Sequence, residues 1–219
     1  MTARARVALL DLGIGNLRSV ERALVEAAAS VGVEIDVVVT SDAAEVSRAD
    51  RLVMPGQGAF RDGSRALAGA LGDAVRESIA IGKPYLGICL GLQLLFPSSE
   101  EAPGERGLDV LPGTNRRLQP GEGARRVKIP HMGWNQIQLH DAAPQSLRAA
   151  HAASPWFYFV HSFHAVPDDA AMIAATATHG DNVVTAAVAW KNVLAAQFHP
   201  EKSQHEGLEL LSGWLASAR

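Results

Sequence analysis

The first ninety residues of this 219-residue sequence alternate short apolar runs with segments of helical periodicity. Residues 7–10, 33–40, 51–54 and 85–88 form the runs, whereas 17–29 and 66–81 carry apolar residues at helical spacing. Strands that alternate with helices pair in parallel through right-handed crossovers, and the helices cover both faces of the sheet. The alternation therefore predicts an α/β fold with a largely parallel central sheet and helices on both faces.

The second half of the sequence predicts a different arrangement. Residues 97–125 are rich in Gly, Pro, Arg and Glu, and we expect irregular surface there. Six β-prone runs follow, and we expect antiparallel strands that extend the sheet at 126–129, 135–139, 156–160, 171–178, 182–190 and 193–198. A final amphipathic helix is expected over 204–217. No linker or repeat interrupts the sequence, which predicts a single domain over residues 1–219.

Charge and cysteine content exclude several classes of protein. The formal net charge of −3 gives no electrostatic reason to expect nucleic acid or an anionic membrane as partner. Cys89 is the single cysteine, so an internal disulfide cannot form and a reducing compartment is expected. The sequence shows neither a secretory signal nor an apolar run of about 20 residues that would span a membrane. We expect a soluble cytoplasmic protein.

Cys89 lies at the end of the fourth predicted strand, within the motif Gly-x-Cys-x-Gly formed by Gly87, Cys89 and Gly91. A nucleophile elbow has this form, because its tight strand-to-helix turn exposes the central side chain and leaves no room for bulky neighbours. The carboxyl edge of such a sheet is also where open α/β folds bind ligands. A small buried cysteine fits the motif equally well, so the motif alone does not decide between the two.

A thiol nucleophile needs a base and an orienting partner for that base. The segment "AAQFHPEKS" ends an apolar run with His199, Pro200 and Glu201. Glu201 could hold the imidazole while His199 takes the thiol proton. Taken alone, this segment fits a turn with a solvated histidine better. Together, a strand-end cysteine and a strand-end His-Pro-Glu favour a catalytic triad.

The third apolar run ends in "PGQGAF", which places Gln57 and Gly58 beside the cysteine strand. Backbone amides of this loop, with that of Leu90 after the nucleophile, could stabilise an oxyanion. One such donor is typically worth about 3–4 kcal/mol in catalysis. An ordinary glycine- and proline-rich strand end is the alternative.

These segments, in this order, resemble the class I glutamine amidotransferases, in which Cys, His and Glu hydrolyse glutamine to glutamate and ammonia. The segments "GNLRSV", "GICLGLQLLF", "KIPHMGWN" and "YFVHSFH" resemble more narrowly the glutaminase subunits of imidazole glycerol phosphate synthase in histidine biosynthesis. The resemblance covers residues 11–203 and implies a flavodoxin-like fold of the amidotransferase type. It also implies a separate (β/α)8-barrel cyclase subunit as partner, which forms a heterodimer and receives the ammonia.

The resemblance assigns roles residue by residue. It implies Cys89 as nucleophile, His199 as base and acid, and Glu201 as orienting partner, with an oxyanion strand at Gln57 and Gly58 that changes its peptide orientation before the hole is complete. Glutamine would be held by Gln93, Glu101, Tyr158, His161 and Ser162. The partner interface would include Asn16, His131, Met132, Trp134, Asn135 and Lys202.

Two positions depart from the pattern of that family. Gln57 stands where valine is common, and because the backbone acts there we expect a small effect. Phe163 replaces a more usual tyrosine and removes a hydroxyl, so any hydrogen bond made through that group is lost. We expect no cofactor and no metal, because no zinc-ligand spacing surrounds His131 or His161 and because "GIGN" does not complete a dinucleotide motif.

Two alternatives stay open at this stage. Another cysteine hydrolase on a similar sheet would keep Cys89 and His199 but would have no use for Gln93, Tyr158 or the "PHMGWN" segment. A non-catalytic amidotransferase-like subunit would need none of the triad. Glutamate release from glutamine distinguishes both from a glutaminase.

Overall fold

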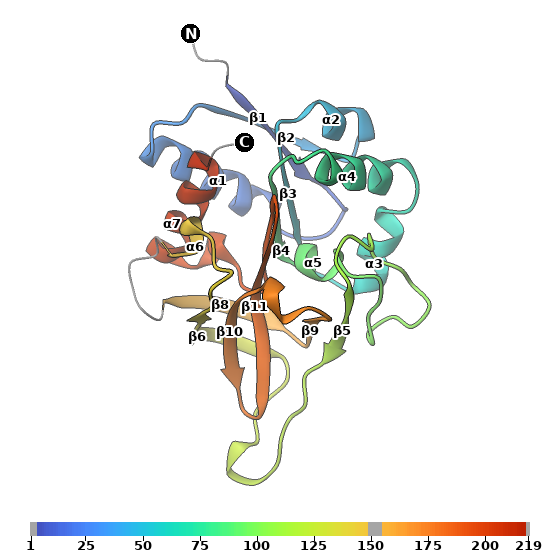
Figure 1. Cartoon of the computed structure of the whole chain (residues 1–219), viewed down its shortest axis with the longest axis vertical. Coiled ribbons are helices and arrows are strands. Elements are labelled where there is room, and N and C mark those ends of the chain that lie inside the picture. Colours follow the sequence, from blue (N-terminus) through green and yellow to red (C-terminus); the bar gives the residue numbers. More distant parts are fainter. Residues whose placement is uncertain (1–3, 149–154, 218–219) are drawn as a thin grey trace.

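The computed structural model describes residues 4–148 and 155–217, and an eight-stranded sheet forms its centre (Figure 1). From edge to edge the strands are β2 (Ile35–Thr40), β1 (Ala5–Leu10), β3 (Arg51–Gly56), β4 (Tyr85–Cys89), β12 (Val193–Ala196), β11 (Asn182–Trp190), β10 (Ile173–His179) and β7 (Gln138–Leu139). The five strands from β2 to β12 are mutually parallel, and β11, β10 and β7 each pair antiparallel with the preceding neighbour. The predicted largely parallel α/β sheet is confirmed.

Helices cover both faces of this sheet, as predicted (Figure 1). Val7 and Leu9 of β1 pack in one apolar cluster with α1 (Leu17–Ser30) and α7 (Gln204–Ala216). Ala8 and Leu10 point the other way, into a second cluster with α2 (Ala43–Arg48), α3 (Phe60–Ala66) and α4 (Ala70–Ala80). The alternation of a strand's side chains thus supplies two cores, one on each face. Within the described ranges, none of the helices is both long and apolar enough to cross a bilayer.

The helix predicted over 66–81 is confirmed over Ala70–Ala80 (α4), but its start is wrong, because the chain turns between α3 and α4. Leu67 ends α3, and Gly69 enters α4 with φ +84°, a conformation that favours glycine. The turn brings the Leu67 carbonyl so close to Gly72 that a Cβ there would lie 2.1 Å from the oxygen. The sequence analysis also missed α2, although Asp42 caps it by accepting from the Ala44 amide at 2.9 Å.

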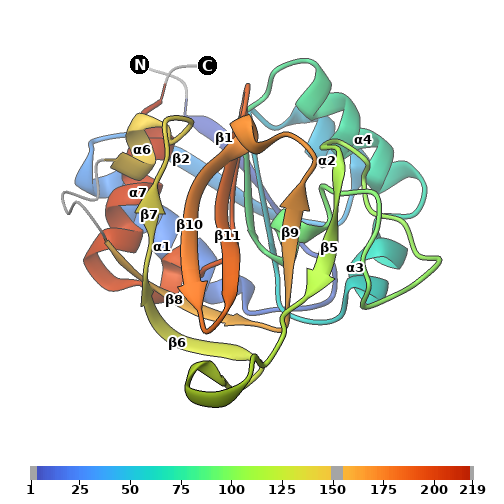
Figure 2. The ribbon, with the colours of Figure 1, turned by 60° about the horizontal axis from the view of Figure 1, so that its bottom comes forward.

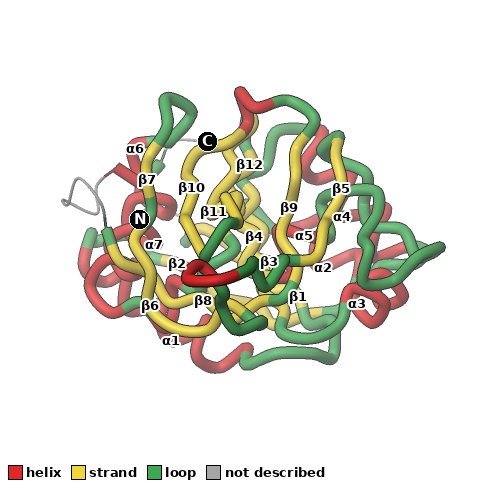
Figure 3. Tube along the Cα trace, turned by 90° about the horizontal axis from the view of Figure 1, so that it is seen from below, coloured by secondary structure: helices red, strands yellow, loops and turns green. Residues whose placement is uncertain are grey.

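Two short antiparallel pairs stand apart from the main sheet (Figures 2 and 3). One pairs β6 (His131–Gln136) with β8 (Trp156–His161), and the other pairs β5 (Gly113–Arg117) with β9 (Phe163–Pro167). The run 156–160 was therefore correctly predicted as a strand but does not extend the main sheet. Its alternate residues Phe157 and Phe159 are fully buried, and the Phe157 ring stacks on Phe198 at 4.0 Å. β5 also shows that 97–125 is not irregular throughout.

Three further strand predictions need correction. Residues 126–129 form no strand, because Gly121 and Gly123 have φ of +68° and +56° and curl the chain into the 3-10 turn Gly123–Arg125. The run 135–139 is divided between β6 and β7, since Ile137 bonds to Pro155 at 3.0 Å instead. β12 covers only part of 193–198 and pairs parallel with β4, although it is antiparallel to β11.

The remaining short helices are α5 (Leu90–Gln93), α6 (Gln145–Arg148) and the 3-10 turns Ala170–Met172 and Pro200–Lys202. α5 starts directly after β4, and Pro200–Lys202 follows β12 after a three-residue connection. Because β3, β4 and β12 are neighbouring parallel strands, Gly56, Cys89 and Ala196 end at the same edge of the sheet. The glycine loop after β3, the cysteine motif after β4 and the His-Pro-Glu segment after β12 therefore meet at the carboxyl edge of the sheet.

Candidate active site

Cys89 occupies the sharp turn between β4 and α5. Its backbone has φ +54° and ψ −103°, a region that non-glycine residues rarely adopt. The residue is 7% exposed and lines a cavity. This is the geometry of a nucleophile elbow, and a cysteine that only filled space would need no such conformation.

The two glycines of the motif are required by close approaches within the elbow. A Cβ at Gly87 would lie 2.7 Å from the Gly91 carbonyl oxygen and 2.9 Å from the Cβ of Ala195 on β12. A Cβ at Gly91 would lie only 1.8 Å from the carbonyl oxygen of Met54 on β3. The elbow is thus wedged between the neighbouring strands β3 and β12, and only glycine fits at either position.

His199 and Glu201 form a buried pair beside the thiol. The His199 Nδ1 atom lies 2.8 Å from Glu201 Oε1, and both side chains are 2% exposed. The backbone amide of His199 donates to the Tyr158 carbonyl at 2.9 Å, which fixes the position of the residue. The Glu201 carboxylate accepts from Nδ1–H, so in the neutral ring Nε2 carries no proton. Among the described residues this buried Nε2 has no hydrogen-bond partner, which leaves it open to a proton from Cys89.

The electrostatics favour a protonated His199. Burial lowers the pKa of its imidazole, but the adjacent Cys89 and Glu201 outweigh burial and raise the pKa to about 9. A raised pKa suits a base that takes up the thiol proton, because both neighbours favour the cationic ring that results. Cys89, His199 and Glu201 are thus brought together as the sequence analysis expected.

A cavity of about 300 Å³ opens on the sulfur of Cys89. Seven further residues that the sequence analysis named line it: Gln57, Gly58, Leu90, Gln93, Glu101, His161 and Ser162. Pro130, Val160 and Phe163 complete the lining. Tyr158 is not among the lining residues, and its ring instead meets Trp134 edge-on at 6.2 Å and lies 5.9 Å from the Lys202 ammonium nitrogen.

The N-terminal loop supports the segment that carries Gln57 and Gly58. A Cβ on Gly15, whose φ is +106°, would lie 3.3 Å from the backbone nitrogen of Gln57. The side chain of Ile14 packs 3.6 Å from the position of a Cβ on Gly58. The "GIGN" segment, which does not complete a dinucleotide motif, therefore packs directly against the candidate oxyanion loop.

A chain of buried histidines runs from the cavity toward β6. His161 Nδ1 lies 2.9 Å from the Phe163 carbonyl, which can only accept, so His161 Nε2 must accept from His131 Nδ1 at 3.0 Å. His131 Nε2 in turn lies 3.1 Å from the Asn135 amide nitrogen. This order requires both rings to be neutral. Burial and its neighbour His131 lower the pKa of His161 to about 3, and burial and His179 lower that of His131 to about 4.

Among the described residues, His131 and His161 belong to no group of side chains that could hold a metal ion. Over residues 4–148 and 155–217, no three or more His, Cys, Asp or Glu side chains gather in a way that could hold a metal ion. The hydrogen bonds of the rings are instead directed to each other, to Asn135 and to the Phe163 carbonyl.

Four of the six residues expected at a partner interface are exposed. On β6 the side chains alternate, so Met132 and Trp134 are 62% and 43% exposed while His131 is buried. Lys202 and Asn16 are exposed, and Asn16 also caps α1 by accepting from the Ser19 amide. Asn135 is half-buried and anchored to the Thr178 carbonyl at 2.9 Å. Met132 and Trp134 lie on the same face of β6, and adjoining exposed apolar side chains of this kind are typical of an interaction surface.

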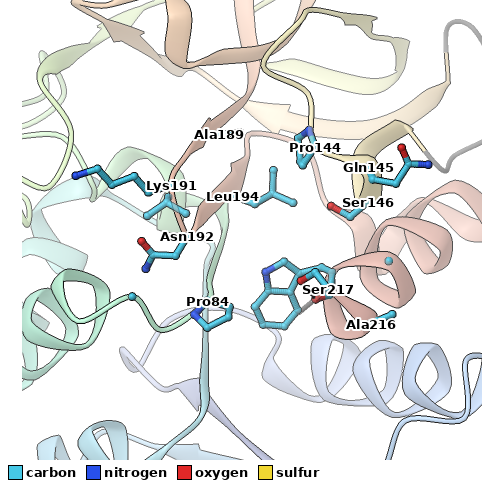
Figure 4. Close-up of a pocket in the computed structure, with 14 residues that line it drawn as sticks. Pro84, Pro144, Gln145, Ser146, Ala189, Lys191, Asn192, Leu194, Ala216 and Ser217 are labelled. Atoms are coloured by element: carbon cyan, nitrogen blue, oxygen red, sulfur yellow. Dashed lines mark hydrogen bonds between the residues drawn. The ribbon is translucent and has the colours of Figure 1, made fainter. Parts of the chain in front are cut away.

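A larger cavity of about 640 Å³ lies at the opposite, amino end of β4 and β12 (Figure 4). Pro84, Asn192, Leu194 and the indole of Trp214 line it, and Lys191 is its one charged lining residue in the described chain. It holds none of the residues with candidate catalytic roles. Size therefore does not identify the active site, whereas the placement of a nucleophile, a base and backbone amides does.

Sequence reasoning missed two residues that contact the nucleophile. The Val160 carbonyl lies 4.0 Å from Cys89 Sγ, and Gln197 Nε2 lies 3.5 Å from it. A backbone carbonyl has no signal in the residue type. Gln197 did have a signal, since it is a polar residue within the otherwise apolar run "VLAAQF".

The comparisons with known proteins agree with this geometry. Residues 10–216 match the family described as glutamine amidotransferase class-I. "Imidazole glycerol phosphate synthase subunit HisH" of Nostoc punctiforme is 44% identical, over 97% of this chain and 96% of its own length. The protein of the same name from Syntrophotalea carbinolica is 45% identical, over 95% and 98%. Among solved structures, the glutaminase domain of Trypanosoma brucei CTPS with bound acivicin superposes with a TM-score of 0.69 at 16% identity, over 97% and 92% of the chains, which supports the fold.

Proposed function

The chain belongs to the class-I glutamine amidotransferase family, and from this premise we propose that it is the glutaminase subunit of imidazole glycerol phosphate synthase in histidine biosynthesis. The observation that carries the proposal is the buried arrangement of Cys89, His199 and Glu201 at one edge of the sheet. The near full-length similarity to the HisH subunits supports the choice among amidotransferases.

In the proposed reaction the Cys89 thiol gives its proton to His199 Nε2 and the sulfur attacks the side-chain carboxamide carbon of glutamine. The tetrahedral intermediate collapses as the C–N bond breaks, and His199 delivers the proton to the departing nitrogen, which leaves as ammonia. Water then attacks the glutamyl thioester with His199 as base, releasing glutamate and restoring the thiol. Glu201 keeps the ring in the required tautomer throughout.

The negative charge of both intermediates needs donors on the far side of the carbon from His199. Leu90, Gln57 and Gly58 line the same cavity as Cys89, and we assign this role to the backbone amide of Leu90 and to the peptide that joins Gln57 and Gly58. The packing of Ile14 and Gly15 against this peptide gives it a defined position.

The amino-acid end of glutamine would be held at the other end of the cavity. We assign this role to Gln93, Glu101, His161 and Ser162, which line the cavity, and Glu101 is already oriented because its carboxylate accepts from the Phe60 amide at 2.9 Å. Tyr158 lies with Trp134 and Lys202 instead, so its assigned role shifts from the substrate to the partner-facing surface.

Ammonia released in bulk water would be protonated and diluted, so it has to pass directly into a partner. We propose a (β/α)8-barrel cyclase subunit as that partner, docked over Met132, Trp134, Lys202 and Asn16, with Pro130 beside the exit from the cavity. The single thiol excludes an internal disulfide and supports action in the reducing cytoplasm, by one domain over residues 1–219.

Glutamate release from glutamine tests the function directly. We expect slow release by the chain alone, a strong increase when the cyclase subunit and its ribotide substrate are added, and no release by Cys89→Ala under either condition. Ser78→Ala is the matched control, since it also removes one heavy atom from a buried side chain but lies on α4, away from the cavity. Undiminished release by Cys89→Ala would refute the proposed nucleophile, and release unaffected by the cyclase would refute the partnership.

A further inference from the structure

Gln197 is a fully buried amide that touches the nucleophile and has no part in the triad. Its side chain is 0% exposed, and its backbone amide donates to the Ala186 carbonyl at 2.9 Å, which continues the pairing of β12 with β11. From this fixed position its Nε2 donates to Cys89 Sγ at 3.5 Å. A buried polar side chain inside an apolar strand is costly unless each polar atom has a partner.

The orientation of the Gln197 amide is set by Gln93. Gln93 Nε2 donates to Gln197 Oε1 at 3.0 Å and to the Phe163 carbonyl at 2.9 Å. Because the oxygen of Gln197 is used by Gln93, its nitrogen must face the sulfur. The reverse orientation would direct one donor against another at Gln93 and an acceptor against the sulfur.

We propose that Gln197 is a positioning residue for glutamine hydrolysis, whose N–H group holds the sulfur of Cys89 and favours its thiolate form. A hydrogen bond to a charged acceptor is stronger than one to a neutral acceptor, so this donor stabilises the thiolate more than the thiol. His199 approaches the sulfur as the proton acceptor, whereas Gln197 supplies a donor that cannot itself take the proton. The inference deepens the proposed function and rests on it only for the reaction, not for the state of the thiol.

The same bonds connect the nucleophile to the substrate cavity. Gln93 lines the cavity and its amide donates to Gln197, which in turn donates to the sulfur of Cys89. The Phe163 carbonyl that accepts from Gln93 also accepts from His161, the first ring of the histidine chain that leads to Asn135 on β6. A ligand that orders Gln93 therefore also orders Gln197, and with it the donor on the sulfur.

The pH dependence of Cys89 alkylation by iodoacetamide tests the inference on the full chain. Cys89 is the only cysteine in the sequence, so the alkylation rate reports this thiolate without interference. We expect Gln197→Met, which keeps the volume but removes the donor, to move the pH midpoint upward by about one unit, equivalent to about a tenfold loss of thiolate at neutral pH. Gln197→Asn, which withdraws the amide by one methylene, should shift it in the same direction and serves if the first variant does not fold.

Thr185→Val is the matched control, since it removes a buried polar group from β11 without touching the sulfur. It should leave the pH midpoint of alkylation unchanged, even where it changes the urea concentration at which the protein unfolds. With the cyclase present, both Gln197 variants should lose about tenfold in kcat/KM for glutamine, mainly in kcat, and the control should not.

A midpoint in both Gln197 variants equal to that of the parent would overturn the inference, and any loss of activity would then be structural. Because alkylation needs neither glutamine nor the cyclase, a parent chain without glutaminase activity would refute the proposed function and still leave this inference decided by its own measurement.

Discussion

Gly91→Ala tests whether the elbow is held by contact between α5 and β3. In an ordinary helix this substitution stabilises a protein by about 0.8–1 kcal/mol, because alanine is the better helix former. Here the new Cβ would lie 1.8 Å from the Met54 carbonyl oxygen, whereas a C···O contact needs about 3.3 Å. Either α5 or β3 must therefore move by roughly 1.5 Å, and β3 is buried along its whole length.

We expect Gly91→Ala to lower the free energy of unfolding by about 2 kcal/mol or more. This is the usual cost of overpacking, after the stabilisation that alanine gives a helix has been subtracted. A displacement of the Cys89 sulfur by about 1 Å relative to glutamine bound in the cavity should also lower glutaminase turnover by about 100-fold. Urea unfolding and glutamate release with the cyclase present measure the two effects.

Gly32→Ala is the control for a change that strains the backbone but meets no other atom. Gly32 has φ +66° and no heavy atom within 4 Å of its Cβ position, so we expect a cost of about 1–2 kcal/mol and full activity. A Gly91→Ala protein as stable as the parent, or as active, would refute the contact between α5 and β3 as the reason for glycine.

Two further predictions concern the titrating groups. Glu201→Gln keeps the hydrogen-bonding shape but removes the charge that helps to raise the pKa of His199, so turnover should fall by about 100-fold or more and the pH profile of alkylation should change; an unaltered profile would contradict the charge argument. The pKa values of His131 and His161 are lowered in the folded protein, so the unfolded chain binds protons first as the pH falls below about 6.5, and stability is lost toward pH 4. The pKa of His199 is raised in the folded protein, so its contribution to stability is complete below about 6.5 and is lost as the pH rises through about 9. The free energy of unfolding from urea titrations should therefore peak near neutral pH, and His131→Gln should flatten the acid side by about 1–2 kcal/mol at pH 5; an unchanged acid slope would show that the ring is not held neutral.

The central sheet and the meeting of Cys89 with His199 were predictable because each rests on a local pattern with a long-range consequence. Short β-branched runs between helical segments can only pair in parallel, and the ends of neighbouring parallel strands must share one edge. For that reason Cys89 and His199, 110 positions apart, could be expected to lie together from their places at two strand ends.

The features that were not predicted depend on contacts with residues far away in the sequence, which a local pattern does not reveal. β8 alternates like any sheet strand, but Phe157 stacks on Phe198 below the main sheet rather than beside it. The residues 126–129 have strand-forming side chains, yet the glycines at 121 and 123 turn the preceding chain away from a partner. Gln197 illustrates the limit for the site, since its contact with the sulfur depends on the register of β12 against β4.

The position of β12 has a consequence for how the protein comes to exist. This strand is the last of the sheet in chain order, but it lies between β4 and β11 and makes one sheet out of the parallel and antiparallel halves. Until residues 193–196 have been synthesised, β4 presents an open edge and Cys89 has no base beside it. The nascent chain thus carries Cys89 without His199 beside it for about half of its synthesis, from residue 89 to residue 199, and the segment that completes the sheet also supplies His199. Contacts between segments so far apart in the sequence form slowly. The pairing of β12 with β4 closes the open edge of β4 and brings His199 to Cys89 in the same step.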